Sequence, residues 1–533
     1  EQVDTDYFEQ LIQKYLIDNT HASVVIIEPC RGLNAKNEAE LEKKLAAYKE
    51  SLSDAQIAQL IADTKHLAEY QETPSPKEDL EKIPMLSRAD MKKEAAPFYN
   101  EEKKIDDVTV VHHNIFSNGI IYLSLLFDIE HIPAEDIPYL GILKGVLGYM
   151  DTEHYTYADF ANEVNIHTGG IGSSIGIYPG TKTQNDYKAK FEVRAKALPD
   201  EIKTAVHLME EMLFGSKFED EKRLYEIIAE LKSRLQVSIS SAGHSVASTR
   251  AMSYFSKAAA YKDSIQFYEL LCDLEAHFEE KKEMLTAKLR TMTKQIFTRE
   301  NLICSVTCDE NGYSNAKTAL ESFLPKLFAM VDRRGKTEII PEKKNEGFMD
   351  ASQVMYVARA GNFRAHGYDY TGALRILKVI MEYDYLWINI RVKGGAYGCM
   401  NGYMKNGDTY FASYRDPNLE KTNEIYNKIP DYIEHFTADE RDMTKYIIGT
   451  LSDLDIPMNP STKGDRSMAA YLQDISYDEV QKERDQILTA TQEDIRGLKD
   501  MIASVLEENN LCAVGNEEVL QAGKEMFMEL KHF

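Results

Sequence analysis

The sequence has few cysteines for its length, and they are scattered. Six cysteines are spread over 533 residues, with no C-x-x-C pair. Cys304 and Cys308 lie together in a run with the composition of a buried strand, which does not favour a zinc knuckle. Scattered cysteines in a chain of this size are typical of reduced, intracellular proteins, and we expect a cytoplasmic location. No apolar run is long enough to span a bilayer, so we expect no membrane partner.

Positive charge is also in short supply. Lysine and arginine total 62 against 87 aspartates and glutamates, which gives a net charge of −25. This charge argues against nucleic acid or an anionic membrane surface as a partner and is compatible with cationic peptide ligands. The composition, 43% hydrophobic and 28% charged, is otherwise that of an ordinary globular protein. At about 150 residues per domain, the length predicts roughly three or four domains.

A zinc motif of the peptidase type is missing. Such a motif, H-x-x-E-H or H-E-x-x-H, places two histidines on one helix face beside a glutamate that acts on the attacking water. Among the 13 histidines, His66, His207 and His277 each begin H-x-x-E, but the second histidine is absent. His112 and His113 are neighbours in a predicted strand, so they point to opposite faces. We therefore predict no metal site in this chain.

The first part of the chain predicts a strand and then two helices. Residues 22–27 have a strand pattern but no partner strand nearby, so either they join a later sheet or the chain starts inside a longer protein. The second interpretation is favoured. Over 37–72, apolar residues recur at helical spacing, with capping-box patterns at Asn37–Glu40 and Ser53–Gln56. We expect a helical hairpin that acts as a structured linker.

Two α+β regions follow. The first is predicted to hold strands at 108–116, 120–127, 187–195 and 301–307, with helices at about 134–150, 199–214, 220–240 and 265–298. The second is predicted to hold strands at 353–358, 408–413 and 511–515, with helices at about 372–385, 418–436, 438–454, 465–473 and 491–507. FANEVNIHTGGIG (160–172) and LWINIRVKGGAYG (386–398) each lead a helix into a Gly-Gly bend. This match predicts a duplicated domain.

The second bend is the main candidate for a functional site. Gly394 and Gly395 allow a close backbone approach that a Cβ would block. Arg391 and Tyr397 offer hydrogen-bond donors to an oxygen-rich ligand. The alternative is a glycine bend between two strands, with Arg391 on the surface and Tyr397 in the core.

Two other glycine motifs are incomplete. The segment Gly243-His244-Ser245-Val246-Ala247 resembles a serine-hydrolase nucleophile elbow, but it lacks the last glycine and follows a charged, helix-like run where the elbow requires a buried strand. A loop or helix start is favoured, and a Ser245 nucleophile is kept as an alternative. Residues 169–175 lack the last glycine of G-x-G-x-x-G, so no dinucleotide site is predicted.

Several segments resemble the C-terminal half of presequence proteases, a branch of the pitrilysin/insulinase zinc metallopeptidases. They are SNGIIYLSLLFDIEHIPAEDIPYLGIL (117–143), AGHSVASTRAMSYFS (242–256), RVKGGAYG (391–398), SYRDPN (413–418) and TQEDI (491–495). The resemblance implies an α+β fold with two related α/β-roll domains, each an antiparallel-rich sheet covered by helices, after a helical-hairpin linker. Residues 1–30 would end a preceding second domain, 31–95 would form the linker, and 96–335 and 336–533 would form the third and fourth domains.

The resemblance also implies where the metal is held. The family's zinc motif belongs to the first domain, which this sequence does not contain. In the third domain, Gly145, Gly148 and Tyr149 stand where a copy of the motif would have its histidine, glutamate and histidine. Zinc would therefore be a cofactor of the absent N-terminal half, which would be the partner of this chain.

The Arg391/Tyr397 pair corresponds to an Arg/Tyr pair that the family contributes from this half. The two side chains would hold the scissile carbonyl and stabilise the developing oxyanion, with Gly394, Gly395 and Ala396 contacting the substrate. We therefore expect the non-metal-binding half of a zinc metalloendopeptidase that degrades short unfolded peptides and is inactive alone. The alternative is a catalytically inactive scaffold of the same fold, which would have no reason to keep both side chains.

Overall fold

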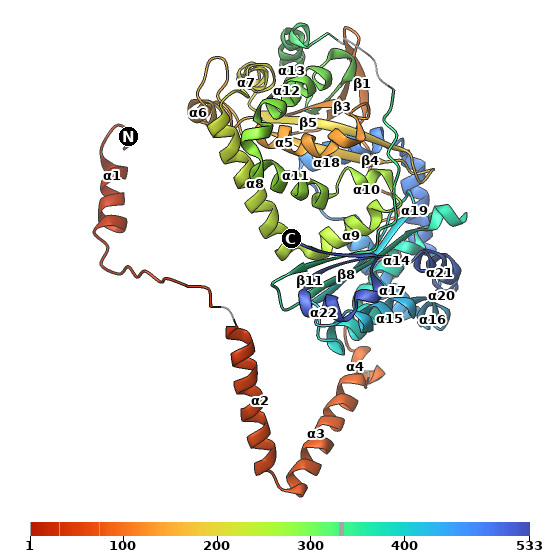
Figure 1. Cartoon of the computed structure of the whole chain (residues 1–533). Coiled ribbons are helices and arrows are strands. Elements are labelled where there is room, and N and C mark those ends of the chain that lie inside the picture. The colour runs from red at the N-terminus through yellow and green to blue at the C-terminus, as the bar shows by residue number, and fades with distance from the viewer. Residues whose placement is uncertain (1, 31, 74, 330–334) are drawn as a thin grey trace. The chain divides into compact units, whose positions relative to one another are not determined.

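The computed structural model describes residues 2–30, 32–73, 75–329 and 335–533 (Figure 1). The chain divides into two compact units, Glu1–Met85 and Leu86–Phe533. No helix in the described ranges is long and apolar enough to cross a membrane.

The first unit is helical and has no buried side chain among its described residues. It contains α1 (Tyr7–Ile12), a π-helical turn (Gln13–Ile17), α2 (Leu33–Ser51), α3 (Asp54–Glu72) and α4 (Lys77–Leu80). The predicted hairpin is present as α2 and α3, and α3 begins with the predicted capping box between Ser53 and Gln56. The predicted start at Asn37 is wrong, because α2 begins at Leu33, after Gly32 with a φ of 76°.

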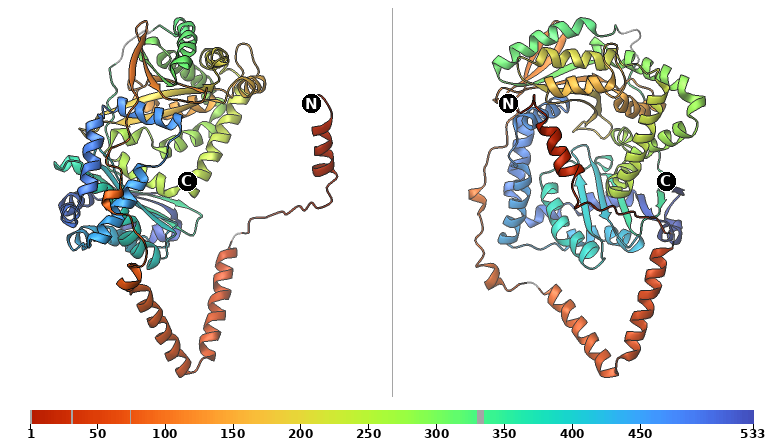
Figure 2. Two further views of the ribbon diagram at one scale, coloured as in Figure 1. Left: turned by 180° about the vertical axis from the view of Figure 1, so that it is seen from behind. Right: turned by 90° about the vertical axis from the view of Figure 1, so that its left-hand side faces the viewer.

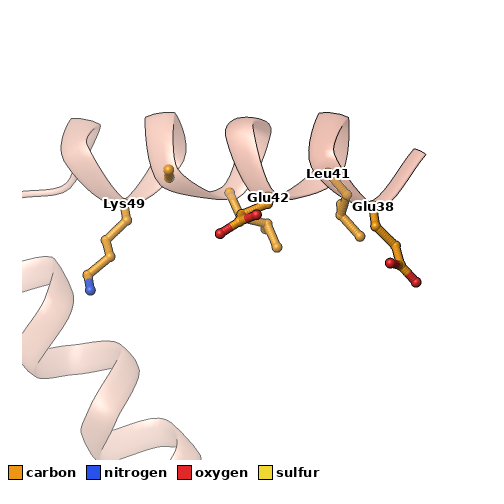
Figure 3. A pocket seen from close by; sticks show the side chains of 6 residues that line it. Glu38, Leu41, Glu42 and Lys49 are labelled. Carbon is orange, nitrogen blue, oxygen red and sulfur yellow. The ribbon is translucent and has the colours of Figure 1, made fainter. Parts of the chain in front are cut away.

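Two apolar stretches of this unit face solvent. The predicted strand at 22–27 is not formed, since a strand needs a neighbour to accept and donate its backbone hydrogen bonds; Val24–Ile27 are 79–89% exposed. On α2, Leu41, Leu45 and Tyr48 are 55–58% exposed. Figure 3 shows Leu41 beside Glu38, Glu42 and Lys49 on one side of this helix, where they line a shallow hollow.

The second unit begins with a six-stranded mixed sheet in the order β1-β2-β6-β3-β5-β4. Its strands are β1 (Glu101–Ile105), β2 (Val108–Asn114), β3 (Ile121–Asp128), β4 (Ile171–Pro179), β5 (Tyr187–Ala197) and β6 (Leu302–Cys308). The pair β2/β6 is parallel and the other pairs are antiparallel. The accompanying helices are α5 (Ile137–Val146), α6 (Tyr157–His167), α7 (Ile202–Phe214), α8 (Glu221–Ser241), α9 (Gly243–Ser253), α10 (Lys257–Ala260), α11 (Ser264–Ala276), α12 (Phe278–Ile296) and α13 (Glu310–Phe323).

A second six-stranded sheet follows, in the order β12-β7-β11-β8-β10-β9. Its strands are β7 (Glu346–Asp350), β8 (Met355–Asn362), β9 (Gly398–Tyr403), β10 (Asp408–Tyr414), β11 (Asn510–Asn516) and β12 (Glu529–His532). Its helices are α14 (Ala373–Ile380), α15 (Glu420–Asn427), α16 (Ile429–Glu434), α17 (Glu440–Leu454), α18 (Pro460–Leu472), α19 (Tyr477–Thr489), α20 (Gln492–Arg496), α21 (Lys499–Glu507) and α22 (Glu517–Ala522). The predicted α+β class with sheets covered by helices is confirmed, and both sheets, predicted to be rich in antiparallel pairs, are mixed (Figures 1 and 2).

The two sheets share one topology, which confirms the predicted duplication. In each, five strands follow the order first, last, second, fourth, third along the chain, as β2-β6-β3-β5-β4 and β7-β11-β8-β10-β9. The first and last strands are parallel in both sheets. The segments with the internal sequence match occupy the same place, because 160–172 leads α6 into β4 and 386–398 leads a helical segment into β9.

Each sheet also packs against a helix from the other half of the unit. Helix α9 lies on β8, β10 and β11, where Val246 and Ala247 join a buried cluster with Ala358 and Val514. Helix α18 lies on β2 and β6, and its Met468 and Leu472 pack against Val111 and Leu126. This exchange explains why the two sheets form one compact unit.

Most predicted elements are present, with differences at the boundaries. The helix predicted at 265–298 is divided at His277 into α11 and α12. The helix predicted at 372–385 continues through two π-helical turns, Met381–Tyr385 and Trp387–Val392. Elements absent from the prediction are the strands β1, β7 and β12, the edge strands β4 and β9, and the helices α4, α10, α13, α19 and α22.

Candidate functional site

The Gly394–Gly395 bend lies at the edge of the second sheet, between the π-helical turns and strand β9. A Cβ on Gly394 would overlap the carbonyl oxygen of Ile390, and Gly395 has a φ of 82°. The Gly395 amide donates to the Arg391 carbonyl (2.9 Å), and the Ala396 amide donates to the Ile390 carbonyl (3.1 Å). The end of the helix and the start of the strand are thereby fixed relative to each other.

The polar turn after β10 holds the bend from the other side. The Asn418 side-chain amide donates to the Gly394 carbonyl (2.6 Å), and the Tyr397 amide donates to the Tyr414 carbonyl (3.0 Å). Asp416 is fully buried and accepts a hydrogen bond from the backbone amide of Asn418 (2.9 Å). Burial raises the pKa of Asp416, and the hydrogen bonds oppose this shift. The sequence marked this turn as polar but did not reveal that it supports the bend.

Arg391 and Tyr397 are brought together at the surface. The Arg391 guanidinium carbon lies 4.1 Å from the Trp387 ring centroid and 5.5 Å from that of Tyr397. Tyr397 is 64% exposed, so the alternative of a core tyrosine is wrong. Among the described residues, no carboxylate lies within ion-pair distance of Arg391. Cation–π contacts therefore orient the guanidinium, and its donors remain available to a ligand.

The positions that the resemblance assigns to a copy of the metal motif do not form a zinc site. Helix α5 ends at Val146, so Gly148 (φ 85°) and Tyr149 lie beyond it and do not share a helix face with Gly145. A Cβ on Gly145 would overlap the Leu231 side chain, so no larger residue fits there without repacking. None of the three positions supplies a metal ligand, and the helix that would present them has already ended.

One group of acidic and histidine side chains in the described ranges is close enough together to hold a metal ion: Glu101, His112 and Glu310. The ammonium of Lys103 already occupies this place, 2.9 Å from His112 Nδ1 and 3.2 Å from Glu310 Oε1. His112 Nε2 lies 3.0 Å from the Cys308 carbonyl and donates to it, which leaves Nδ1 to accept from the lysine. Burial lowers the pKa of His112, which favours this neutral form. The cluster is a lysine-centred polar network.

The incomplete nucleophile elbow lies in a helix. Ser245 falls in the first turn of α9 and follows helix α8, whereas an elbow requires a preceding strand. The predicted helix start is confirmed. A Cβ on Gly243 would overlap the Tyr356 ring, so this glycine allows α9 to lie close to the second sheet.

Two family models match the sequence. The domain associated with subfamily C of the M16 peptidases matches residues 27–274, and the PreP C-terminal domain matches residues 345–517. The chain is similar to Protein HypA of Clostridium perfringens, with 38% identity over 530 residues that cover 99% of this chain and 54% of that protein. It is also similar to Presequence protease 1, chloroplastic/mitochondrial, of Arabidopsis thaliana, with 28% identity over 98% of this chain and 49% of that protein. The chain spans about half the length of the curated relatives it matches.

Solved structures agree in fold. A peptidase M16 inactive domain from Pseudomonas fluorescens matches with a TM-score of 0.52 and 14% identity, over 78% of this chain and 98% of that one. A protease from Helicobacter pylori matches with a TM-score of 0.53 and 12% identity, over 79% of this chain and 100% of that one. The two family models and the relatives show that the chain belongs to the presequence-protease-like M16 peptidases and corresponds to the C-terminal half of such a protein.

Proposed function

We propose that this chain is the non-metal-binding half of a zinc metalloendopeptidase that degrades short unfolded peptides. It would close the digestion chamber and contribute Arg391 and Tyr397 to substrate binding. The observation that supports this most directly is the pairing of an oriented guanidinium with an exposed phenol on a rigid bend. Peptides that pass through the site would contact Gly394, Gly395 and Ala396 through their backbone.

The chemistry of the two side chains suits a peptide carbonyl. A guanidinium and a phenolic hydroxyl both donate hydrogen bonds, and these bonds become stronger as the carbonyl oxygen gains negative charge. Loss of one such donor typically lowers kcat by roughly 10²–10³. The Trp387 ring keeps the guanidinium in place before substrate arrives, so little ordering is needed on binding.

Zinc would be held outside this chain. Neither the end of α5 nor the Lys103 cluster offers a free ligand set, so none of the described residues takes over its role. The cofactor is assigned to the N-terminal half, together with the metal-dependent steps. This chain alone would then be inactive, and its part is to bind and orient the peptide.

The same proposal assigns domains to the chain. Residues 1–30 would end the second peptidase domain, 31–95 would be the linker, and 96–335 and 336–533 would be the third and fourth domains. The exposed leucines of α2 and the exposed Val24–Ile27 segment support a partner for the first unit, because apolar side chains at these exposures favour burial. The N-terminal half of the same protein is the proposed partner.

Peptide hydrolysis by the full-length protein tests the proposal. Tyr397→Phe should lower kcat about 10²-fold or more by removing one donor. Tyr383→Phe is the matched control, since Tyr383 is also exposed (70%) and lies in the preceding π-helical turn. Normal turnover by Tyr397→Phe would exclude that residue from the reaction. Hydrolysis by this chain alone would show that the chain has a catalytic centre of its own. If the chain stays inactive even when the N-terminal half is added, the alternative of an inactive scaffold would be favoured.

A further inference from the structure

Cationic and aromatic side chains lie against one another from the bend to the turn after β10. The Arg391 guanidinium stands over the Trp387 and Tyr397 rings, at 4.1 and 5.5 Å. The Tyr397 ring meets Tyr414 edge-on, with centroids 5.8 Å apart. The guanidinium of Arg415 then lies 5.5 Å from the Tyr414 ring. We call these five residues the cation–aromatic row.

Arg415 is held in an unusual backbone conformation. Its φ is 48°, in the left-handed region that residues with a Cβ seldom adopt. The Tyr397 amide donates to its carbonyl (3.3 Å), which ties the turn to the bend. The adjacent Tyr414 ring lies 5.6 Å from the ring of Tyr356, whose hydroxyl donates to the Ser240 carbonyl at the end of α8 (2.8 Å). Strained positions of this kind persist where the surroundings hold them, and they concentrate at binding sites.

The rings around Arg415 are also fixed from the first half of the unit. His244, in the first turn of α9, meets the Tyr414 ring edge-on at 4.9 Å and 89°. It also lies 6.3 Å from the Tyr356 ring. Contacts from both halves therefore orient the aromatic surface on which the Arg415 guanidinium rests.

The charge of the row is uncompensated. Within the described ranges, no carboxylate is within ion-pair distance of Arg391 or Arg415, although acidic residues outnumber basic ones in this sequence. The neighbouring Asp416 is buried, and its oxygens accept hydrogen bonds from Thr422 (2.6 Å) and the Asn418 amide (2.9 Å). Arg415 is itself exposed. A planar guanidinium with free donors matches the two oxygens of a carboxylate.

We propose that Arg415 binds a carboxylate of the peptide while Arg391 and Tyr397 hold its backbone. This inference rests on the proposed function, because it assigns a substrate subsite beside that pair. The carboxylate would come from the C-terminus of the peptide or from an acidic side chain. Either source would select among peptides by charge, and Arg415 would then determine specificity without acting on the scissile bond.

Trp387 provides the readout. It is the only tryptophan in the sequence and is in contact with Arg391, so its fluorescence reports on the row alone. The 533-residue chain would be titrated with one peptide in four forms: free C-terminus or amide, each with glutamate or glutamine in the middle. We expect the forms that supply the bound carboxylate to bind about tenfold more tightly, as expected for a charge-assisted hydrogen bond. The comparison of glutamate with glutamine and the comparison of the free C-terminus with the amide show which of the two carboxylates is bound.

Three variants test the assignment. Arg415→Asn tolerates the left-handed backbone and should bind all four peptides with equal affinity. Arg415→Lys keeps the charge and should retain part of the preference. Arg290→Gln removes an exposed arginine on α12 and should behave like the unchanged chain.

Equal binding of all four peptides by the unchanged chain would overturn the inference and leave the proposed function standing. A preference that survives in Arg415→Asn would also overturn it, as would the absence of binding by every peptide, checked by calorimetry. The proposed function fails separately, if Tyr397→Phe leaves hydrolysis by the full-length protein unchanged.

Discussion

Replacing Arg250 with methionine should weaken the contact between α9 and the second sheet. Arg250 is buried on α9 and reaches Glu346 at the start of β7 through two hydrogen bonds of 2.7 and 2.9 Å. It also pairs with Asp263, and the side chains of Asp263 and Glu346 are 1% and 0% exposed. Lys531 lies 3.0 Å from Glu346 and also pairs with Glu269 and Glu529, but in the described part of the chain it makes no ion pair with Asp263. The substitution would therefore leave Asp263 buried without its cation.

The expected loss follows from that arrangement. Removing one partner of a buried ion pair costs about 3–5 kcal/mol, because the remaining charge stays desolvated. With an m-value of about 3 kcal/mol/M in urea, the unfolding midpoint should fall by about 1–1.7 M. Arg299→Met is the matched control, since Arg299 also pairs with two carboxylates, Asp106 and Asp107, but these are 71% and 70% exposed. Its midpoint should stay within experimental error.

The pH dependence gives an independent check. Burial raises the pKa of Glu346, but the hydrogen bonds and charges of Arg250 and Lys531 outweigh it and leave the pKa below its ordinary value. Glu346 therefore stabilises the fold above the ordinary carboxyl pKa of 4.5 and loses this contribution as the pH falls below it. The difference between Arg250→Met and the unchanged chain should shrink over the same range. A midpoint equal to that of Arg299→Met at neutral pH would refute this reasoning.

Four further substitutions test other parts of the fold. Burial lowers the pKa of His113 to about 4 from 6.5, so the unchanged chain should lose up to about 3 kcal/mol of stability between pH 6.5 and 4, and His113→Asn should flatten urea midpoints measured across this range. Gly464→Ala would overlap Thr307 and should cost about 1–3 kcal/mol in urea unfolding. Thr307→Ala in the same chain should restore part of that loss; no recovery would contradict the packing explanation. Asn418→Ala removes the 2.6 Å hydrogen bond to Gly394 and should cost about 1 kcal/mol and change tryptophan emission; unchanged emission would contradict its support of the bend.

The sequence predicts helices and strands well where the residues of the segment itself determine its secondary structure. Strand β5 and helix α8 have clear apolar periodicity, and the Ser53–Gln56 capping box specifies the start of α3 by local hydrogen bonds. Strand β4 is different, because its segment GSSIGI is rich in glycine and serine and resembles a loop. It is a strand because its backbone pairs with that of β5, so the residues that determine its structure lie outside the segment itself.

The secondary structure of the segment before the bend is hard to predict from sequence for a related reason. Residues 387–392, WINIRV, have the β-branched and aromatic composition of a strand, and one hypothesis placed the bend between two strands. They are helical because Leu386 and Ile390, four residues apart, are both fully buried on one side. The surroundings of Arg415 cannot be predicted from its own segment for another reason, because the Tyr414 ring beside it packs against His244 and Tyr356, far away in the chain.

The duplicated topology separates the contribution of the backbone from that of the side chains. A helix enters the third strand of each repeated set through glycine, and Gly170 (φ 123°) and Gly395 (φ 82°) both have positive φ. The bend is therefore a property of the fold and carries no chemistry by itself. The first copy, FANEVNIHTGGIG (160–172), contains neither arginine nor tyrosine, whereas the second contains Arg391 and Tyr397. Any activity specific to the second bend would have to come from side chains that the first bend lacks, and Arg391 and Tyr397 are two of these.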